Sequence, residues 1–400
     1  MRHVIVAASL ATLMPASVYA AEEGASQSFF DESRWIAEAR YRFETVDVDN
    51  ALQTAYASTL RTQAGFETNP ELAVSALVEV EDVHSIGEQR FNSTTNGRDQ
   101  YNVVPDPDGT ELNQAYLTLR GGGLRARAGR QGIALDNERF IGNVDFRQNE
   151  QSYDALMMQA NAGGNRLTYG YLKRVNRFLG EDHPLGRLEL RTHLLNYSWN
   201  RLNADRLTAY AYLLEFDEPE LRAAATQTYG VSYDGSFDFA TRKLLYRAEY
   251  ANQTEYADNP AQLDVWYANL EIGFRFANQW VITAGAEVLS GDGALAFQTP
   301  LATLHKFNGF ADVFAAATPP DGLQDRYLRM YLPILGTRLT ITLHDFVSDQ
   351  ANLDYGREVD AELNWRLGSH WMVGVKYAEY SAEEFAADTR KGWVWLQATF

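Results

Sequence analysis

The chain has 400 residues, with 53 acidic against 35 basic side chains, a formal net charge of −18 and no cysteine. This acidic balance disfavours nucleic acid as a partner, because binding a phosphate backbone requires a basic surface. The absence of cysteine excludes disulfides and thiolate metal sites, so backbone pairing and packing must hold the fold together.

The N-terminus is typical of a secretory signal peptide. Arg2 precedes an apolar run over 4–14, and the small residues Val18 and Ala20 stand where a signal peptidase reads the chain. The run is too short for a membrane-spanning helix, which needs about 20 apolar residues. We therefore predict a cleaved signal over residues 1–20 and one exported domain over residues 21–400.

Beyond the signal, apolar and polar side chains alternate with a period of two, which indicates strands. In the segment 357–368, Val359 and Trp365 share one face, while Glu358 and Asp360 share the other. The same alternation predicts about 18 strands, at 34–45, 53–66, 71–84, 110–120, 123–131, 152–162, 166–176, 188–201, 206–216, 225–237, 242–252, 263–276, 280–289, 326–333, 337–347, 357–367, 371–381 and 391–400.

The connections between these strands alternate in length. Tight turns fall at 68–71, 121–123, 162–165, 202–205, 277–279, 335–337 and 367–370, and longer links fall at 85–109, 132–151, 177–187, 217–224, 253–262, 290–325, 348–356 and 382–390. Short periplasmic turns and long extracellular loops are typical of bacterial outer-membrane barrels, and an even strand count closes an antiparallel sheet. We predict an all-β fold, a transmembrane antiparallel barrel of about 18 strands surrounded by outer-membrane lipid and lipopolysaccharide.

Aromatic residues gather near the strand ends, where membrane-interface girdles would lie; core packing is the alternative interpretation. The residues are Trp266, Phe276, Trp280, Trp371, Tyr377, Trp393 and Trp395. The last segment, "WVWLQATF", ends on Phe400 and resembles the C-terminal signal of outer-membrane barrels. We therefore expect the barrel-assembly machinery to recognise this final strand.

Basic residues occur at many positions whose phase predicts a lumen-facing side chain. A barrel of this size leaves an aqueous lumen, so a pore is the default function. Guanidinium groups on its wall either bind carboxylates of the cargo or balance inward acids such as Glu249 and Glu287. The predicted inward cations include Arg40, Arg42, Arg61, Arg120, Arg127, Arg191, Arg247, Arg275, Arg329, Arg366 and Lys376.

The stretch 135–155 is unusually rich in polar and charged side chains, yet Phe140 and Phe146 give it apolar anchors. We predict that it folds inward and sets a constriction; the alternative is a loop folded over the rim with its arginines paired internally. In the inward pose, guanidinium groups face a passing carboxylate, acids hold them in place, and amides bond to sugar hydroxyls. The residues in these roles are Arg130, Arg139 and Arg147, then Asp136, Asp145 and Asp154, then Asn137, Gln148 and Asn149.

Two motifs resemble those of the alginate-export family of outer-membrane porins. They are "GRQGIALDNERFIGNVDFRQNEQSYDA" at 129–155 and "SGDGALAFQTPLATLHKFNGFADVF" at 290–314. The resemblance covers nearly the whole mature chain. It implies a monomeric 18-stranded barrel with an arginine-rich constriction for an anionic saccharide.

Other functions have weaker support in the sequence. No G-x-S-x-G or H-E-x-x-H motif occurs, so we expect neither an enzyme nor a cofactor. The turns 106–109 and 290–293 are compatible with calcium, although Gly-Asp turn chemistry explains them without a metal. The leading prediction is a passive porin for anionic saccharides or acidic small molecules. The alternatives are a non-conducting structural or adhesion barrel and an uptake porin for small acidic or sugar nutrients.

Overall fold

The computed structural model describes residues 30–202, 205–334 and 336–400, so the predicted signal peptide at 1–20 lies outside the described residues. Each of the 18 predicted segments forms a strand. The strands are β1 (Arg34–Val48), β2 (Ala55–Glu67), β3 (Val74–Ser85), β4 (Gly109–Gly121), β5 (Leu124–Gln131), β6 (Ser152–Ala162), β7 (Asn165–Asn176), β8 (Arg187–Leu202), β9 (Asp205–Leu214), β10 (Thr226–Phe239), β11 (Arg242–Glu255), β12 (Asp264–Arg275), β13 (Val281–Leu289), β14 (Leu323–Ile334), β15 (Thr337–Val347), β16 (Asp354–Leu367), β17 (Trp371–Ala382) and β18 (Thr389–Thr399).

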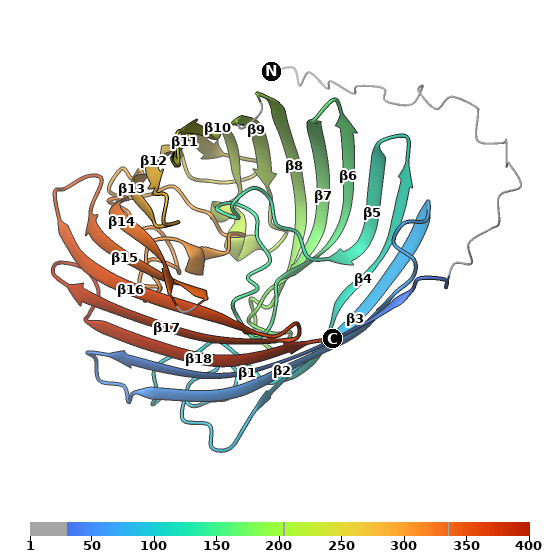
Figure 1. Ribbon diagram of the computed structural model, residues 1–400. Coiled ribbons are helices and arrows are strands. Elements are labelled where there is room, and N and C mark those ends of the chain that lie inside the picture. Colours follow the sequence, from blue (N-terminus) through green and yellow to red (C-terminus); the bar gives the residue numbers. More distant parts are fainter. Residues whose placement is uncertain (1–29, 203–204, 335) are drawn as a thin grey trace, which may run out of the picture.

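The strands form one closed antiparallel barrel (Figure 1). Each strand pairs with its neighbours in the sequence, and β1 pairs with both β2 and β18, so the sheet has no free edge. The predicted 18-stranded antiparallel barrel is confirmed. Within the described ranges, no helix has the length and apolar character that crossing a membrane requires.

The period-two pattern separates an apolar outer face from a polar lumen. On β16, Val359 and Trp365 are 47% and 45% exposed on the outer face, while Glu358 and Asp360 are buried on the inner face. Trp266, Trp280, Trp371 and Tyr377 also lie exposed on the outside, as the predicted girdles require. The prediction is wrong for two of the tryptophans, because Trp393 and Trp395 are buried on the inner face of β18.

The long connections lie at one end of the barrel and the short turns at the other. We call the half of the lumen next to the long connections the upper half, and the half next to the short turns the lower half. Two long connections, loop 132–151 between β5 and β6 and loop 290–322 between β13 and β14, run through the interior of the ring (Figure 1). The short 3₁₀ helices η1 (Pro219–Ala224) and η2 (Leu304–Lys306) also lie in connections.

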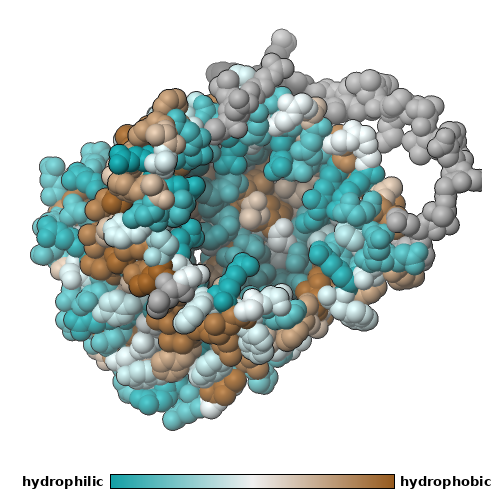
Figure 2. Space-filling view, viewed as in Figure 1, coloured by the Kyte–Doolittle hydropathy of each residue, from teal (hydrophilic) through white to brown (hydrophobic). Residues whose placement is uncertain are grey.

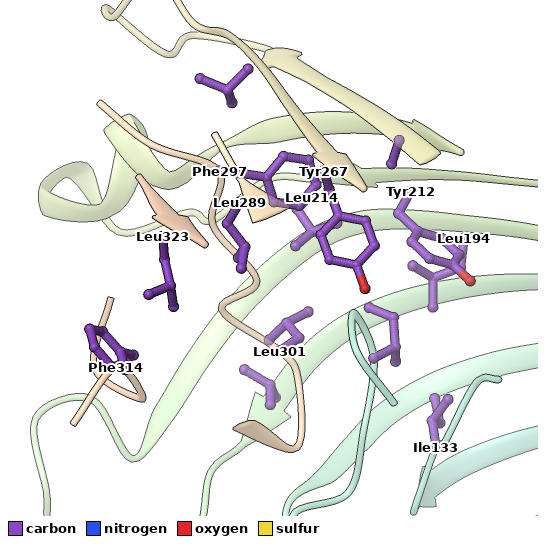
Figure 3. Close-up of a cluster of buried hydrophobic side chains, with 14 of the residues drawn as sticks. Ile133, Leu194, Tyr212, Leu214, Tyr267, Leu289, Phe297, Leu301, Phe314 and Leu323 are labelled. Atoms are coloured by element: carbon purple, nitrogen blue, oxygen red, sulfur yellow. The ribbon is translucent and has the colours of Figure 1, made fainter. Parts of the chain in front are cut away.

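A hydrophobic core joins these two loops to the barrel wall (Figure 3). Ile141 from one loop and Phe297 and Leu301 from the other are almost fully buried against wall residues that include Tyr212 and Tyr267. A β-bridge between Ile141 and Leu301 ties the loops to each other. The loops therefore fill much of the upper half of the lumen.

Candidate functional site

Below the two loops, the lumen contains a cavity of about 1010 Å³. Its wall is the continuous run of strands from β14 through β18 to β1 and β2, and its ceiling consists of loop tips that carry Phe146, His305 and Phe310. Figure 2 shows the molecule hollowed at its centre, with hydrophilic residues around the hollow. This cavity is a part of the lumen in which a solute has room.

Cationic side chains outnumber carboxylates in this cavity by eight to five. The cavity therefore carries an excess of positive charge within a chain whose net charge is −18. Local charges dominate the potential at short range, where the dielectric constant is low. The cationic lining residues are Arg40, Arg42, Arg61, Lys306, Arg329, Arg338, Arg366 and Lys376, and the acidic ones are Glu38, Asp145, Glu150, Asp360 and Glu362.

Three of the lining arginines, Arg40, Arg338 and Arg366, have no carboxylate within 4.0 Å among the described residues. Arg40 is held instead by neutral acceptors, since its Nε donates to Gln148 Oε1 at 2.9 Å and its Nη1 donates to the carbonyl oxygen of Asp145 at 2.9 Å. Arg338 lies over the ring of Tyr331, at 4.9 Å from the centroid. These positive charges are therefore not neutralised by an ion pair.

The two loop arginines are paired and buried. Arg139 is 1% exposed, and its Nη2 donates to Glu287 Oε2 on β13 at 3.2 Å and to Asn308 Oδ1 of loop 290–322 at 3.0 Å. Arg147 donates from Nη1 to both carboxylate oxygens of Glu44 on β1, at 3.2 and 3.3 Å. The inward pose of loop 132–151 is confirmed, but these guanidinium groups fasten the loop and do not face the cavity.

The protonation of Arg147 is secured by its partners. Burial alone would lower the pKa of Arg147, but the carboxylates of Glu44, Asp106 and Asp312 outweigh burial and raise that pKa above its ordinary value. Pairing with carboxylates offsets the cost of burying this charge. Arg147 therefore stays charged and fixed.

The amide side chains predicted to bind sugar hydroxyls are hydrogen-bonded to other groups of the protein. So is Asp136, which we predicted to hold an arginine in place. Gln148 is fully buried, accepts from Arg40 and donates from Nε2 to Thr59 Oγ1 at 2.8 Å. Asn149 Nδ2 donates to the carbonyl oxygen of Pro107 at 3.1 Å. Asp136 accepts from Asn196, and Asn137 accepts from the backbone of Arg139. These side chains shape the ceiling, and their contact with cargo stays a prediction.

His305 forms the centre of the ceiling. Its ring stacks on Phe146 with centroids 3.8 Å apart, its Nδ1 lies 2.7 Å from Asp312 Oδ1, and its Nε2 lies 3.1 Å from Nζ of Lys376. Burial lowers the pKa of His305 to about 3, so the ring is neutral. The neutral ring donates from Nδ1 to Asp312 and accepts from the Lys376 ammonium at Nε2. The ceiling is thereby tied to β17.

The other predicted lumen cations divide into two groups. Arg42, Arg61 and Lys376 line the cavity with carboxylate partners, and Arg329 lies 3.8 Å from Glu271. A second group faces the lumen away from this cavity: Arg120 donates to the backbone of Pro70, Arg127 lies over Tyr116, Arg247 pairs with Glu249, and Arg275 ends β12.

The predicted inward orientation is wrong for Arg191 and Arg130. Arg191 is 59% exposed at the side chain and pairs with Glu215 and Asp217 on the outer face, while its neighbour Thr192 is buried inside. Arg130 lies on the outer face of β5 and pairs with Asp154, which also contacts Arg174. On β8 the usual pattern of a polar inner face and an apolar outer face is reversed. Its inner face is apolar, because Leu190 and Leu194 pack against the hydrophobic core of the loops.

Two lining cations were missed by sequence reasoning. Arg338 follows the turn before β15, in phase with the inward residues Thr340 and Thr342, and this phase was a signal that could have identified it. Lys306 lies in η2, where no alternation applies, and it pairs with Glu138 of the other loop. Only the docking of the two loops brings Lys306 to the cavity.

The described residues contain no group of three or more histidine, cysteine or acidic side chains arranged to hold a metal ion. In the two turns considered for calcium, the carboxylates bind protein donors. Asp108 accepts from the backbone and hydroxyl of Ser85, and Asp292 accepts from the backbone amides of Ala294 and Leu295. These bonds are typical of Asp turns.

Solved structures from two bacteria have the same fold. OccAB4 of Acinetobacter baumannii superposes with a TM-score of 0.72 at 14% identity, over 92% of this chain and 98% of that chain. OpdO of Pseudomonas aeruginosa gives a TM-score of 0.73 at 14% identity, over 93% and 98%. OpdK of the same organism, solved with vanillate, gives 0.71 at 10% identity, over 93% and 100%.

The comparison with curated proteins gives no match. The sequence model of the alginate export family matches residues 32–354, which is most of the chain. This match includes both loops of the ceiling and the strands β1 and β13, to which the arginines of loop 132–151 bond. The chain therefore belongs to the alginate export family and is a porin-like barrel of the bacterial outer membrane.

Proposed function

We propose that this barrel is a passive channel for anionic solutes that carry carboxylate groups, and that it is not an enzyme. The observation that carries the proposal is the cationic cavity, in which Arg338 and Arg366 are exposed and have no carboxylate partner among the described residues. A guanidinium group without an ion partner offers its hydrogen bonds to a passing carboxylate.

The size of the open space bears on the cargo. The ceiling narrows the lumen above a cavity of about 1010 Å³, which favours a small acid or a slender uronate chain over a bulky solute. Membership of the alginate export family supports an anionic saccharide, and the structure of OpdK with vanillate supports a small carboxylate. Both cargoes present the same chemical group to the wall.

A planar-bilayer recording of the purified protein tests the proposal. We expect a reversal potential under a salt gradient that shows anion preference, and we expect the preference to weaken as salt screens the wall charges. Replacing Arg338 and Arg366 together by Ala removes two unpaired lining charges and should lower the anion preference. Cation preference in the unmodified protein would overturn the proposal.

Arg357→Ala is the matched control. Arg357 lies on the same strand as Arg366 but points outward, with 75% of its side chain exposed and a pairing to Asp345 at 3.2 Å. This control should leave reversal potential and conductance unchanged. An equal effect of both substitutions would show that the lumen position of Arg366 has no special role.

One observation favours a second function, a non-conducting structural or adhesion barrel. The two loops fill the upper half of the lumen and are fastened to several strands. The same recording separates the two functions, because a structural barrel passes no current at any applied voltage. Uptake of a labelled uronate oligomer into vesicles, against a neutral oligomer of equal length, would then identify the cargo of a conducting barrel.

The proposal also covers the oligomeric state and the assembly of the barrel. The barrel has no free edge for pairing with another copy, which supports a monomer. The final strand ends in Phe400 beside the exposed ring of Trp371, and this end of the strand is the segment that we propose the barrel-assembly machinery recognises.

A further inference from the structure

A pair of carboxyl groups under the ceiling is not used by the proposed channel function. Glu358 and Asp360 stand two residues apart on the inner face of β16, and each is 1% exposed. Both hold loop 290–322: Glu358 Oε1 accepts from the backbone amide of Ala311 at 2.7 Å, and Asp360 Oδ2 accepts from that of Phe310 at 3.1 Å. The loop tip is thus docked onto these two side chains.

The second oxygen of each carboxyl group is buried without a hydrogen-bond donor. Glu358 Oε2 and Asp360 Oδ1 find no partner, although the two side chains lie within hydrogen-bonding reach of each other. Two carboxylates cannot bond to each other, whereas a carboxylic acid can donate to a carboxylate. One proton between them would satisfy both oxygens.

The surrounding charges neutralise only part of the pair. On β15, His344 Nε2 lies 3.5 Å from Asp360 and its Nδ1 lies 2.8 Å from Asp325 on β14, so one imidazole ring is shared between two carboxyl groups. On β17, Lys376 is directed to Glu362 and His305, and Tyr380 donates its hydroxyl to backbone carbonyls. From the loop, only the two backbone amides reach the pair.

The backbone of the loop leaves no room for another ligand at this point. Gly309 has φ +85°, and a Cβ built on it would lie 2.3 Å from Glu358 Oε2. The group between the two carboxyls therefore has to be very small, and the described residues there do not form a metal site. A proton meets this requirement.

We propose that Glu358 and Asp360 share one bound proton, and that this proton keeps the ceiling loop docked over the cavity. The expected consequence, gating of the channel by pH, rests on the proposed channel function. Two buried carboxyls at one site hold a proton more tightly than two carboxyls exposed to water. The stability that the proton gives to docking is therefore present at low pH and is lost as the pH rises through the range where the docked pair releases it.

Single-channel recording across a pH series provides the first test. We expect the open probability to rise by up to about tenfold per pH unit as the pH approaches the release point of the docked pair, and to level off above it. The substitution Glu358→Gln imitates the protonated pair, since its amide oxygen accepts from Ala311 and its NH₂ group donates to Asp360. At all pH values, this variant should keep the low open probability that the wild type shows at low pH. Asp360→Asn should do the same if Glu358→Gln fails to fold.

Glu379→Gln serves as the matched control, because Glu379 pairs with Arg390 on the outer side of β17. Its pH response should equal that of the unmodified protein. A wild-type open probability that does not change from about pH 5 to about pH 9 would overturn the inference. So would an unchanged pH response in Glu358→Gln.

A second measurement does not require conduction and so separates this inference from the channel function. Hydrogen exchange at the amides of Phe310 and Ala311 is compared between wild type and Glu358→Gln at the same pH, which cancels the intrinsic pH dependence of exchange. We expect equal rates at low pH and, at high pH, wild-type exchange faster by about tenfold or more. Equal rates at both pH values would refute the proton site even in a barrel that conducts anions.

Discussion

Both halves of the lumen contain arginines, but arginines of the upper half are paired with carboxylates, whereas two arginines of the lower half have no such partner. In the upper half, Arg139 and Arg147 are buried and bonded to Glu287 and Glu44, and they fasten loop 132–151 to two separate strands, β13 and β1. In the lower half, Arg338 and Arg366 line open space with no carboxylate within 4.0 Å among the described residues. The difference lies in the partners and not in the guanidinium group, so an arginine in a pore has to be judged by its neighbours.

The largest effect is expected from breaking a paired arginine of the upper half. Arg139→Ala leaves Glu287 buried and without its charged partner, which should lower the free energy of unfolding by about 3–5 kcal/mol. Urea unfolding in detergent measures the loss. Arg338→Ala, the same change in the lower half, should stay close to wild type. Equal losses in the two variants would remove the distinction between the halves.

An intermediate effect is expected at the amide that joins the loop to the wall. Gln148→Ala leaves Thr59 and Arg40 without their buried partner, which should cost about 1–3 kcal/mol in the same unfolding experiment. Gln159→Ala is the control, because the hydrogen bond of Gln159 to Thr168 is long, at 3.5 Å. A loss in Gln148→Ala no greater than in the control would mean that the loop is held by its hydrophobic core alone.

The smallest effect is expected outside the barrel. Arg191 was predicted in the lumen but lies on the outer face with Glu215 and Asp217. Arg191→Ala should therefore leave the reversal potential unchanged, while Arg366→Ala should shift it toward lower anion preference. A shift of equal size in the two variants would contradict the assigned orientation of β8.

Sequence reasoning located the strands well because alternation persists wherever one face meets lipid and the other meets water. Segments such as 152–162 and 337–347 agree with β6 and β15 to the residue. On β8 and β18, orientation was misassigned because a third environment intervenes. The inner ends of β8 and β18 pack against the hydrophobic core of the loops, so Leu190 and Trp393 face inward and the charged Arg191 faces outward.

The site could be predicted only in part. The apolar anchors of loop 132–151 correctly indicated an inward fold, because Phe140 packs on Tyr210 and Tyr212 in the wall. The pairing of its arginines depends on Glu44, Glu287 and Asp312, which are distant in sequence and carry no local signal. A count of charges therefore could not reveal which cations remain unpaired.

The anchoring of loop 132–151 also has a consequence for the order of assembly. Its arginines bond to residues 103 and 148 positions away in the chain, on β1 and on β13. Contacts of such separation form late, because the intervening chain must be in place first. The ceiling can therefore be completed only after both strands have joined the sheet, which places the closing of this inner partition late in the assembly of the barrel.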